Sequence, residues 1–179
     1  AVKTFEDIEN ELFILMDKEL RFLSNKDVIY GANMDEDSLM DGTNEYVEVL
    51  REHAKSVNAD VITLCAKIEE ELVGMEDDEA KEMLTDLGVE ESGLEQIIHT
   101  SFDKLGLQSY FTAGKVEVRA WTIKKGTKAP QAAAVIHNDF EKGFIKAEVI
   151  SYEDFVSNGG EAKCKEAGKL RLEGKDYVM

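Results

Sequence analysis

The residues Asn33-Met34-Asp35-Glu36 have the types and the spacing that suit recognition of a nucleotide base. They follow a short apolar run at residues 28–32, which predicts a buried strand. In P-loop nucleotide-binding proteins, a strand that ends in Asn-x-x-acid is where the base is read. A carboxylate at this position can accept the two adjacent N–H donors of guanine. The alternative is that Asn33 only ties two loops together after the strand.

The motif departs from the form that reads guanine. Glu36 is one methylene longer than the Asp of that form, and Met34 replaces a lysine whose stem would cover the base. Met34 can supply the same apolar face. Adenine presents a donor at N6 and an acceptor at N1, so it has no pair of donors to match a carboxylate. On the residues alone, base recognition and the loop tie both remain open.

The chain lacks the motif that holds phosphates. A Walker A loop has the form Gly-x-x-x-x-Gly-Lys-Ser/Thr, and no Gly-Lys pair in this sequence is followed by Ser or Thr. Phosphoryl transfer needs a phosphate cradle and a bound Mg²⁺. We therefore expect no catalytic residue here and no hydrolysis of ATP or GTP by this chain alone. Mg²⁺ is expected only in a phosphate-binding part that is missing from the sequence.

Other reactive side chains do not form a recognisable site. His137 and Asp139 have no third metal ligand spaced nearby, so a hydrogen-bonded turn is the simpler interpretation, and no metal site is predicted. Cys65 is expected to be buried at a strand end, which disfavours a role as nucleophile. Cys164 lies between two lysines, and we expect it to be exposed and open to oxidation.

The charge of the 179-residue chain is unevenly spread. Its composition, 43% hydrophobic and 33% charged, is that of a globular protein with one domain or two small ones. Residues 1–108 hold 9 Lys/Arg and 28 Asp/Glu, whereas residues 109–179 hold 12 Lys/Arg and 10 Asp/Glu. This asymmetry predicts two modules, of which only the second could approach a phosphate backbone.

The sequence carries no sign of a membrane or secretory protein. No segment approaches the ~20 apolar residues of a membrane span, and the N-terminus lacks a signal-peptide pattern. Cys65 and Cys164 lie far apart and form no CxxC pair, so reduced thiols are the default. We expect a cytoplasmic protein with neither a membrane nor DNA as a partner.

The elements that would position the base motif form a βαβ unit. Residues 28–32 and 61–65 predict two buried strands, and a helix with an apolar inner face, ending near residue 57, joins them. Such a unit is expected to be parallel and right-handed.

Helices are predicted on both sides of this unit. The first runs from Thr4 to about Leu23, and two short ones lie near residues 77–86 and 93–105. Ser92 and Glu95 predict a capping box at the start of the last helix. The acidic residues 69–71 are interpreted as a solvated helix face.

From Tyr110 the pattern changes to that of a small α+β module. Residues 116–123 alternate apolar and polar side chains, which predicts a half-buried strand before a turn. Pro130 stands in the first turn of an alanine-rich helix, and residues 144–150 predict another strand. The order strand, strand, helix, strand fits a module of β-grasp type.

Long segments of the sequence carry a resemblance to a known family. In the second half they are Tyr110-Phe111-Thr112-Ala113-Gly114 and residues 117–123, 126–133, 136–148, 167–169 and 173–178. They closely resemble the C-terminal TGS domain of the YchF subfamily of Obg-like ATPases. In the first half, Asn33-Met34-Asp35-Glu36 resembles the family's variant of the Asn-Lys-x-Asp motif. Thr63-Leu64-Cys65-Ala66-Lys67-Ile68-Glu69 resembles its Ser-Ala-Lys-type motif.

The resemblance implies a fold. Residues 1–108 would be an α/β remnant, the parallel βαβ of a P-loop domain together with the exit from a helical arm. Residues 109–179 would be an α+β TGS domain of β-grasp type that lacks its last strand. The P-loop, switch and Walker B segments of the family would precede residue 1, so the chain is expected to be a fragment.

The resemblance also implies a function. The parent protein would bind and hydrolyse ATP in preference to GTP and associate with the ribosome or RNA. Asn33 and the backbone of Met34 would be the nearest contacts to the base. The implied base-binding residues are Asn33, Met34 and Glu36, with Cys65, Ala66 and Lys67 on the opposite lip.

Contact with RNA or the ribosome is expected through the second half. Lys124, Lys125 and Lys128 cluster on a turn, and Trp121 lies near them in sequence. The residues alone favour a solvated surface around core aromatics, and the resemblance raises the RNA interpretation. The alternative function is a standalone TGS-type adaptor that binds RNA or the ribosome and has no enzymatic activity.

Overall fold

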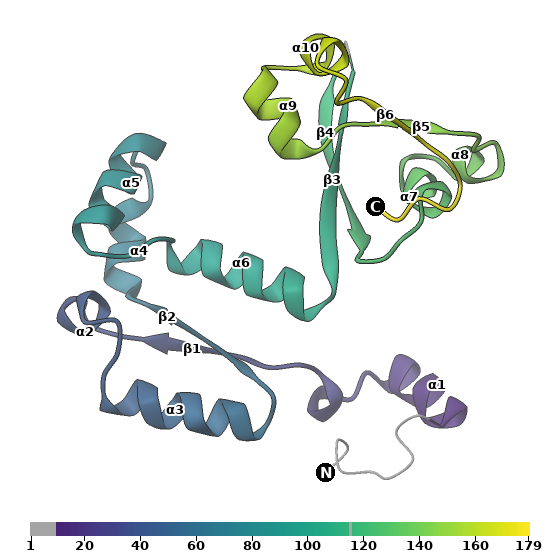
Figure 1. Cartoon of the computed structure of the whole chain (residues 1–179). Coiled ribbons are helices and arrows are strands. Elements are labelled where there is room, and N and C mark those ends of the chain that lie inside the picture. The colour runs from purple at the N-terminus through teal and green to yellow at the C-terminus, as the bar shows by residue number, and fades with distance from the viewer. Residues whose placement is uncertain (1–9, 115) are drawn as a thin grey trace. The chain divides into compact units, whose positions relative to one another are not determined.

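The computed structural model describes residues 10–114 and 116–179. The chain divides into two compact units, one ending at Lys104 and the other spanning Leu105–Met179 (Figure 1). The boundary predicted near residue 108 falls inside strand β3 (Leu107–Ala113), just within the second unit. No helix among the described residues is long and apolar enough to cross a membrane.

The first unit alternates helices with two strands. Its elements are α1 (Glu11–Leu20), the 3₁₀ turn η2 (Leu23–Asn25), β1 (Ile29–Asn33), α2 (Glu36–Met40), α3 (Glu45–Ser56), β2 (Asp60–Leu64), α4 (Ala66–Leu72), α5 (Asp77–Asp86) and α6 (Gly93–Lys104).

The predicted βαβ unit is confirmed. Strands β1 and β2 pair in parallel, from Ile29 opposite Asp60 to Asn33 opposite Leu64, and α3 connects them. Asn44 starts α3 because its side chain accepts hydrogen bonds from two backbone N–H groups of the first turn. Since the two strands run in the same direction, the loops that follow them emerge at one edge of the sheet.

The main apolar core of the first unit lies beneath that edge. Met34, Leu39, Val47, Cys65 and Ile68 form one buried cluster, and side chains from α4, α5 and the loop after α5 pack against it. Met34 and Cys65 each follow a strand directly, so the core fixes the start of both loops. The predicted burial of Cys65 is confirmed, at 4% exposure.

The capping box at the start of α6 is also confirmed. The Glu95 carboxylate accepts the Ser92 backbone N–H at 2.9 Å, and Ser92 Oγ accepts the Glu95 backbone N–H at 3.2 Å. The backbone hydrogen bond and then the hydroxyl contact of Ser92 hold the pKa of Glu95 below its usual value.

The second unit contains two strand pairs and four helices within its described residues. Its elements are β3 (Leu107–Ala113), β4 (Val118–Lys124), α7 (Ala129–Ile136), α8 (Asn138–Lys142), β5 (Ala147–Val149), α9 (Tyr152–Asn158), α10 (Glu161–Glu166) and β6 (Arg171–Glu173).

Strands β3 and β4 form an antiparallel hairpin, and α7 packs beside it. Tyr110 lies opposite Trp121 in the hairpin, and its hydroxyl donates to the carbonyl of Ala132 on α7 at 2.9 Å. Trp121 is half-buried, and its Nε1–H donates to Thr112 Oγ1 at 2.9 Å. Pro130 stands in the first turn of α7, as predicted.

Several predicted boundaries were wrong. The helix predicted to reach Leu23 ends at Leu20, because Arg21 takes a left-handed conformation with φ of 51°. The predicted start at residues 4–9 lies outside the described residues. The strand predicted at 144–150 is limited to Ala147–Val149, where β6 offers an antiparallel partner. Helix α2 was not predicted.

The fold class is confirmed at the level of a mixed α and β protein with small sheets. Within residues 10–114 and 116–179, the strands form three separate two-stranded sheets, β1–β2, β3–β4 and β5–β6. The more specific assignments, a P-loop remnant and a β-grasp TGS domain, stay predictions.

The prediction that Cys164 is exposed was wrong. The side chain is fully buried on α10, and its thiol donates to the carbonyl of Asp154 on α9 at 3.3 Å. The flanking lysines point to solvent because successive residues of a helix lie on different faces. The pairing of α9 and α10 therefore removes this thiol from easy oxidation.

Candidate functional site

A pocket of about 430 Å³ lies in the first unit, at the edge where β1 and β2 end. It brings together the two loops that sequence analysis selected. In parallel α/β structures, ligands bind outside the carboxyl ends of the strands. All six residues predicted for base recognition line this pocket. The complete lining is Asn33, Met34, Asp35, Glu36, Asp37, Cys65, Ala66 and Lys67.

Two hydrogen bonds join the loops across the pocket. The side-chain oxygen of Asn33 accepts the Ala66 backbone N–H at 2.9 Å. The Met34 backbone N–H donates to the carbonyl of Leu64 at 2.8 Å. The loop tie proposed as an alternative for Asn33 is therefore present. This tie uses only the carbonyl of the Asn33 amide, so its NH₂ group is not consumed by it and could donate to a ligand.

Met34 and Cys65 contribute little exposed surface to the pocket. Their exposed fractions are 6% and 4%, and both side chains belong to the core cluster. The exposed residues of the lining are Asn33, Asp35, Asp37, Ala66 and Lys67. A base in this pocket would consequently meet mainly polar side chains from these two loops, and the expectation that Met34 supplies an apolar face there was wrong because its side chain lies in the core.

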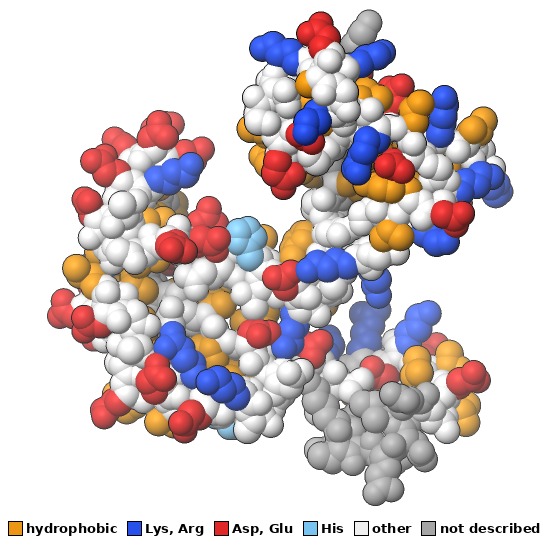
Figure 2. All heavy atoms as spheres, viewed as in Figure 1, with side chains coloured by type: hydrophobic (Ala, Val, Ile, Leu, Met, Phe, Trp, Pro, Cys, Tyr) orange, Lys and Arg blue, Asp and Glu red, His pale blue; other side chains and the backbone are white. Residues whose placement is uncertain are grey.

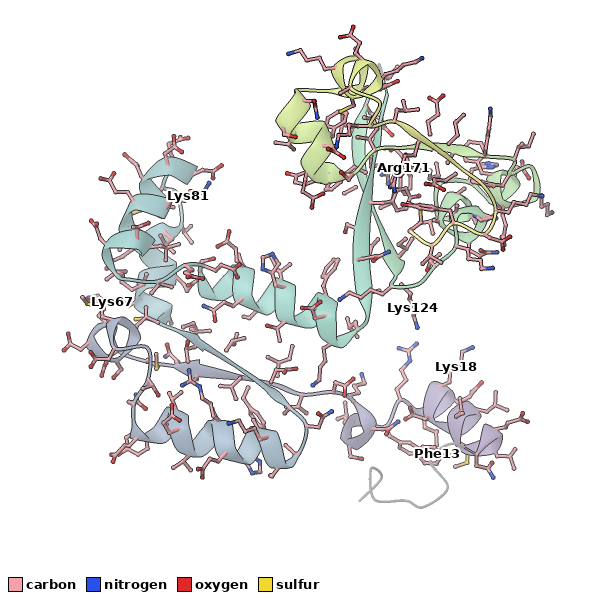
Figure 3. All side chains as sticks on the ribbon, viewed as in Figure 1. Phe13, Lys18, Lys67, Lys81, Lys124 and Arg171 are labelled. Carbon is pink, nitrogen blue, oxygen red and sulfur yellow. The ribbon has the colours of Figure 1, made fainter. Side chains whose placement is uncertain are left out.

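Charged side chains from α2 and α4 meet at the rim. Lys67 Nζ lies 2.5 Å from Glu36 Oε1, and Figure 3 labels Lys67 close to α2. The hydrogen bond to Glu36, and then the charges of Glu36 and Glu71, raise the pKa of Lys67. Asp35 caps α2, since its Oδ1 accepts the Ser38 backbone N–H at 2.8 Å, and this bond lowers the pKa of Asp35.

Sequence analysis missed Glu69 as a residue that positions the pocket. Its carboxylate accepts the backbone N–H groups of Gly93 at 2.6 Å and Leu94 at 3.2 Å, at the start of α6. A carboxylate suits a helix N-terminus, where backbone donors lack partners. Because Glu69 lies on α4, two residues after Lys67, its hydrogen bonds link this side of the pocket to α6. The acidic run at 69–71 was predicted as solvated, and for Glu69 that was wrong.

Gly93 fits closely against the end of β2. A Cβ atom at this position would lie 2.5 Å from Leu64 Cβ and 3.1 Å from Glu69 Oε1. Glycine therefore lets α6 approach the strand that leads into Cys65 and Ala66. No local pattern in the sequence indicated this contact.

The three lysines proposed for RNA contact lie on and beside the turn between β4 and α7. Lys124 is exposed at the end of β4, where Figure 3 labels it. Lys128 Nζ lies 2.8 Å from Asp176 Oδ1, and this contact lowers the pKa of Asp176. The acidic partner offsets part of the positive charge that the sequence suggested. Figure 2 shows acidic side chains gathered over α5 in the first unit and basic ones spread over the second.

The described residues contain no group of three or more His, Cys, Asp and Glu side chains that could hold a metal ion. His137 instead caps α8, since its Nδ1 accepts the Asp139 backbone N–H at 3.2 Å. The interpretation of these two residues as a hydrogen-bonded turn is confirmed.

Comparison with known proteins decides the family. The YchF-GTPase_C family model, described as a protein of unknown function, matches residues 107–179. A relative called "Ribosome-binding ATPase YchF" from Bacillus subtilis is 53% identical over 163 residues, covering 90% of this chain and 44% of the relative. "Obg-like ATPase 1" from Gallus gallus is 40% identical over 181 residues, covering 100% of this chain and 45% of the relative.

A solved structure agrees with these relatives. The structure of the Schizosaccharomyces pombe YchF GTPase is similar with a TM-score of 0.76 and 39% identity, over 95% of this chain and 45% of that one. The chain belongs to the YchF family. It spans less than half the length of the curated YchF relatives it matches, so the activity of a whole YchF protein is a proposal for this one.

Proposed function

We propose that the pocket binds the base of a nucleoside triphosphate, with ATP preferred over GTP, as part of a YchF-type ATPase. The observation that carries the proposal is the convergence of Asn33, Met34 and Glu36 with Cys65, Ala66 and Lys67 around one pocket. These two segments lie in different loops and resemble the two base-reading motifs of the family. The relatives are named as ATPases, and one neighbour is named as a GTPase.

The polar groups of the pocket suit adenine better than guanine. Adenine needs an acceptor for its N6 amino group and a donor for N1 or N7. Backbone groups and the Asn33 amide can provide both. Guanine needs a carboxylate with two available oxygens, whereas Glu36 is held by Lys67 and Asp35 by the first turn of α2. The carboxylates are thus engaged in ways that do not serve guanine.

Hydrolysis would need groups that this chain does not supply. No Walker A motif occurs in the sequence, so no residue here is assigned to the β- and γ-phosphates or to Mg²⁺. The chain would contribute base selection, and it alone is expected to release no phosphate from ATP or GTP.

The test of base choice restores the short carboxylate of the guanine-reading form. Glu36→Asp does this at the rim of the pocket and leaves the core residue Met34, which is 6% exposed, unchanged. In the intact natural protein, calorimetric titration with ATP and GTP should show about a tenfold shift toward GTP, within the discrimination of one bidentate contact. The matched control is Glu76→Asp, which makes the same change outside the pocket. Equal shifts in both variants would refute base reading by residues 33–36.

We also propose that the second unit is a TGS domain that contacts the ribosome or RNA. The support is its charge, its family match over residues 107–179 and the printed names of the bacterial relatives. Residues 109–179 carry +2, against −19 for the rest, so a phosphate backbone would approach this half. A protein that binds the ribosome acts in the cytoplasm, so the proposal implies a cytoplasmic location.

The ribosome contact is tested through its salt dependence. Changing Lys124, Lys125 and Lys128 to glutamine should weaken sedimentation with ribosomes and flatten its dependence on salt, because fewer counterions are displaced. The control changes Lys18, Lys55 and Lys81 of the first unit and alters the net charge equally. Binding that ignores both salt and the first three lysines would refute the basic patch and favour a protein-docking role.

A further inference from the structure

An ion pair bridges the two loops of the pocket. Glu36 is the first residue of α2, and Lys67 is the second residue of α4. Their side chains approach to 2.5 Å although they lie 31 positions apart in the sequence. Both side chains remain accessible, with 42% of Glu36 and 69% of Lys67 exposed. The pair is therefore part of the rim that an entering base would meet.

Lys67 stands beside Glu36 as a cation. Lys67 keeps its proton because the contact with Glu36, together with Glu71, raises the Lys67 pKa. An ammonium has three donors and no acceptor, and in this structure one of its donors reaches Glu36 Oε1. One oxygen of the Glu36 carboxylate, Oε1, is consequently occupied by the Lys67 ammonium.

Guanine recognition requires what this contact removes. The N1–H and N2–H₂ groups of guanine are two adjacent donors, and a carboxylate satisfies them with both oxygens. A ligand that must first displace an ammonium loses part of its binding free energy. Adenine makes no such demand, because it carries only one amino donor on that edge.

Two further carboxylates line the pocket and need to be distinguished from Glu36. Asp35 is committed to the N-terminus of α2 through Ser38. Asp37 is exposed in the first turn of α2 and also lines the pocket, but it lies one residue past the Asn-x-x-acid spacing. Asp37 thus serves as the natural comparison for Glu36, with the same charge on the same helix.

We infer that Lys67 determines base specificity by occupying the Glu36 carboxylate, which keeps that carboxylate from accepting the two N–H donors of guanine. The inference rests on the proposed base site and deepens it. Lys67 is a positioning residue in this scheme, because it acts on the base through Glu36. Its aliphatic stem can still lie beside the base, as in an ordinary base pocket.

The experiment measures the ratio of the GTP and ATP dissociation constants by calorimetry on the intact natural protein. Lys67→Met keeps the length and apolar stem of the side chain and removes its charge. This variant should lower the GTP-to-ATP ratio about two- to fivefold, the range expected for release of an exposed ion pair. Lys81→Met, an equal charge change on α5 outside the pocket, should leave the ratio unchanged.

Adding Lys67→Met to two other variants separates its action on Glu36 from a general effect of charge. In Glu36→Gln, the carboxylate is absent, so adding Lys67→Met should no longer change the ratio. In Asp37→Asn, adding Lys67→Met should still lower it two- to fivefold. Non-additivity with Glu36 and additivity with Asp37 is the pattern that the inference requires.

The outcomes distinguish this inference from the proposed function. An unchanged ratio in Lys67→Met, with ATP still preferred and Glu36→Asp still effective, would overturn the role of Lys67 alone. An equal effect of Lys67→Met in the Glu36→Gln background would also overturn it. If neither Glu36→Asp nor Lys67→Met alters nucleotide choice, the base site itself is refuted and the inference falls with it.

Discussion

Substitution of Gly93 by alanine tests how the pocket is supported. The added Cβ would lie 2.5 Å from Leu64 Cβ, which is 0.9 Å closer than the 3.4 Å at which ordinary contact begins. Leu64 Cβ is bonded directly to the backbone of β2, so it cannot rotate away. The strand or helix α6 must move instead, and that movement also disturbs the contact of Glu69 with the Gly93 N–H.

The expected destabilisation can be worked from these contacts. Overpacking costs about 1–3 kcal/mol, and a clash with backbone-linked atoms belongs to the upper part, about 2–3 kcal/mol. Alanine regains at most about 1 kcal/mol over glycine in a helix. The net loss is about 1–2 kcal/mol, a roughly 5- to 30-fold rise in the open population. Because Leu64 accepts the Met34 N–H, ATP should also bind less well.

Hydrogen exchange of the backbone amides of β2 and α6 measures this loss of stability for the first unit alone. Gly31→Ala is the matched control, because its Cβ would meet the same Leu64 side chain at an ordinary 3.9 Å. That change should leave protection unaltered or slightly higher, since alanine restricts the unfolded chain more than glycine does. Protection in Gly93→Ala that equals the wild type, or an equal loss in Gly31→Ala, would refute the packing argument.

Two further outcomes follow from the contacts described above. The Glu95 pKa is lowered in the folded chain, so its stabilising contribution is present above the usual glutamate value of about 4.5 and is lost as pH falls through the lower folded value. Normalised exchange protection at the start of α6 should therefore decline on acidification below about pH 4.5, and Glu95→Gln should flatten that decline; an unchanged profile in the variant would contradict the capping role. Cys65 and Cys164 are 4% and 0% exposed, so an aromatic disulfide reagent should modify neither thiol in the folded chain and both in urea. Prompt reaction of Cys164 in the native protein would show that α9 and α10 do not shield it.

Features encoded within a few residues could be predicted well. The apolar runs of β1 and β2 stand out because buried parallel strands carry few polar residues. The capping box of Ser92 and Glu95 and the proline at the start of α7 are equally local. Strand limits were less accurate, since β5 extends only as far as β6 pairs with it.

Which two loops line the pocket could be predicted from the sequence, because residues 34–36 and 65–67 follow the two strands of a recognisable βαβ unit. How those loops are held depends on contacts between residues far apart in the sequence. Glu36 meets Lys67 across 31 positions, and Glu69 meets Gly93 across 24. Cys164 is buried for the same kind of reason, since α9 covers it. A local sequence pattern predicts which side of a helix or strand is buried. Contacts such as these depend on how separate elements pack against each other, and that packing involves the whole chain.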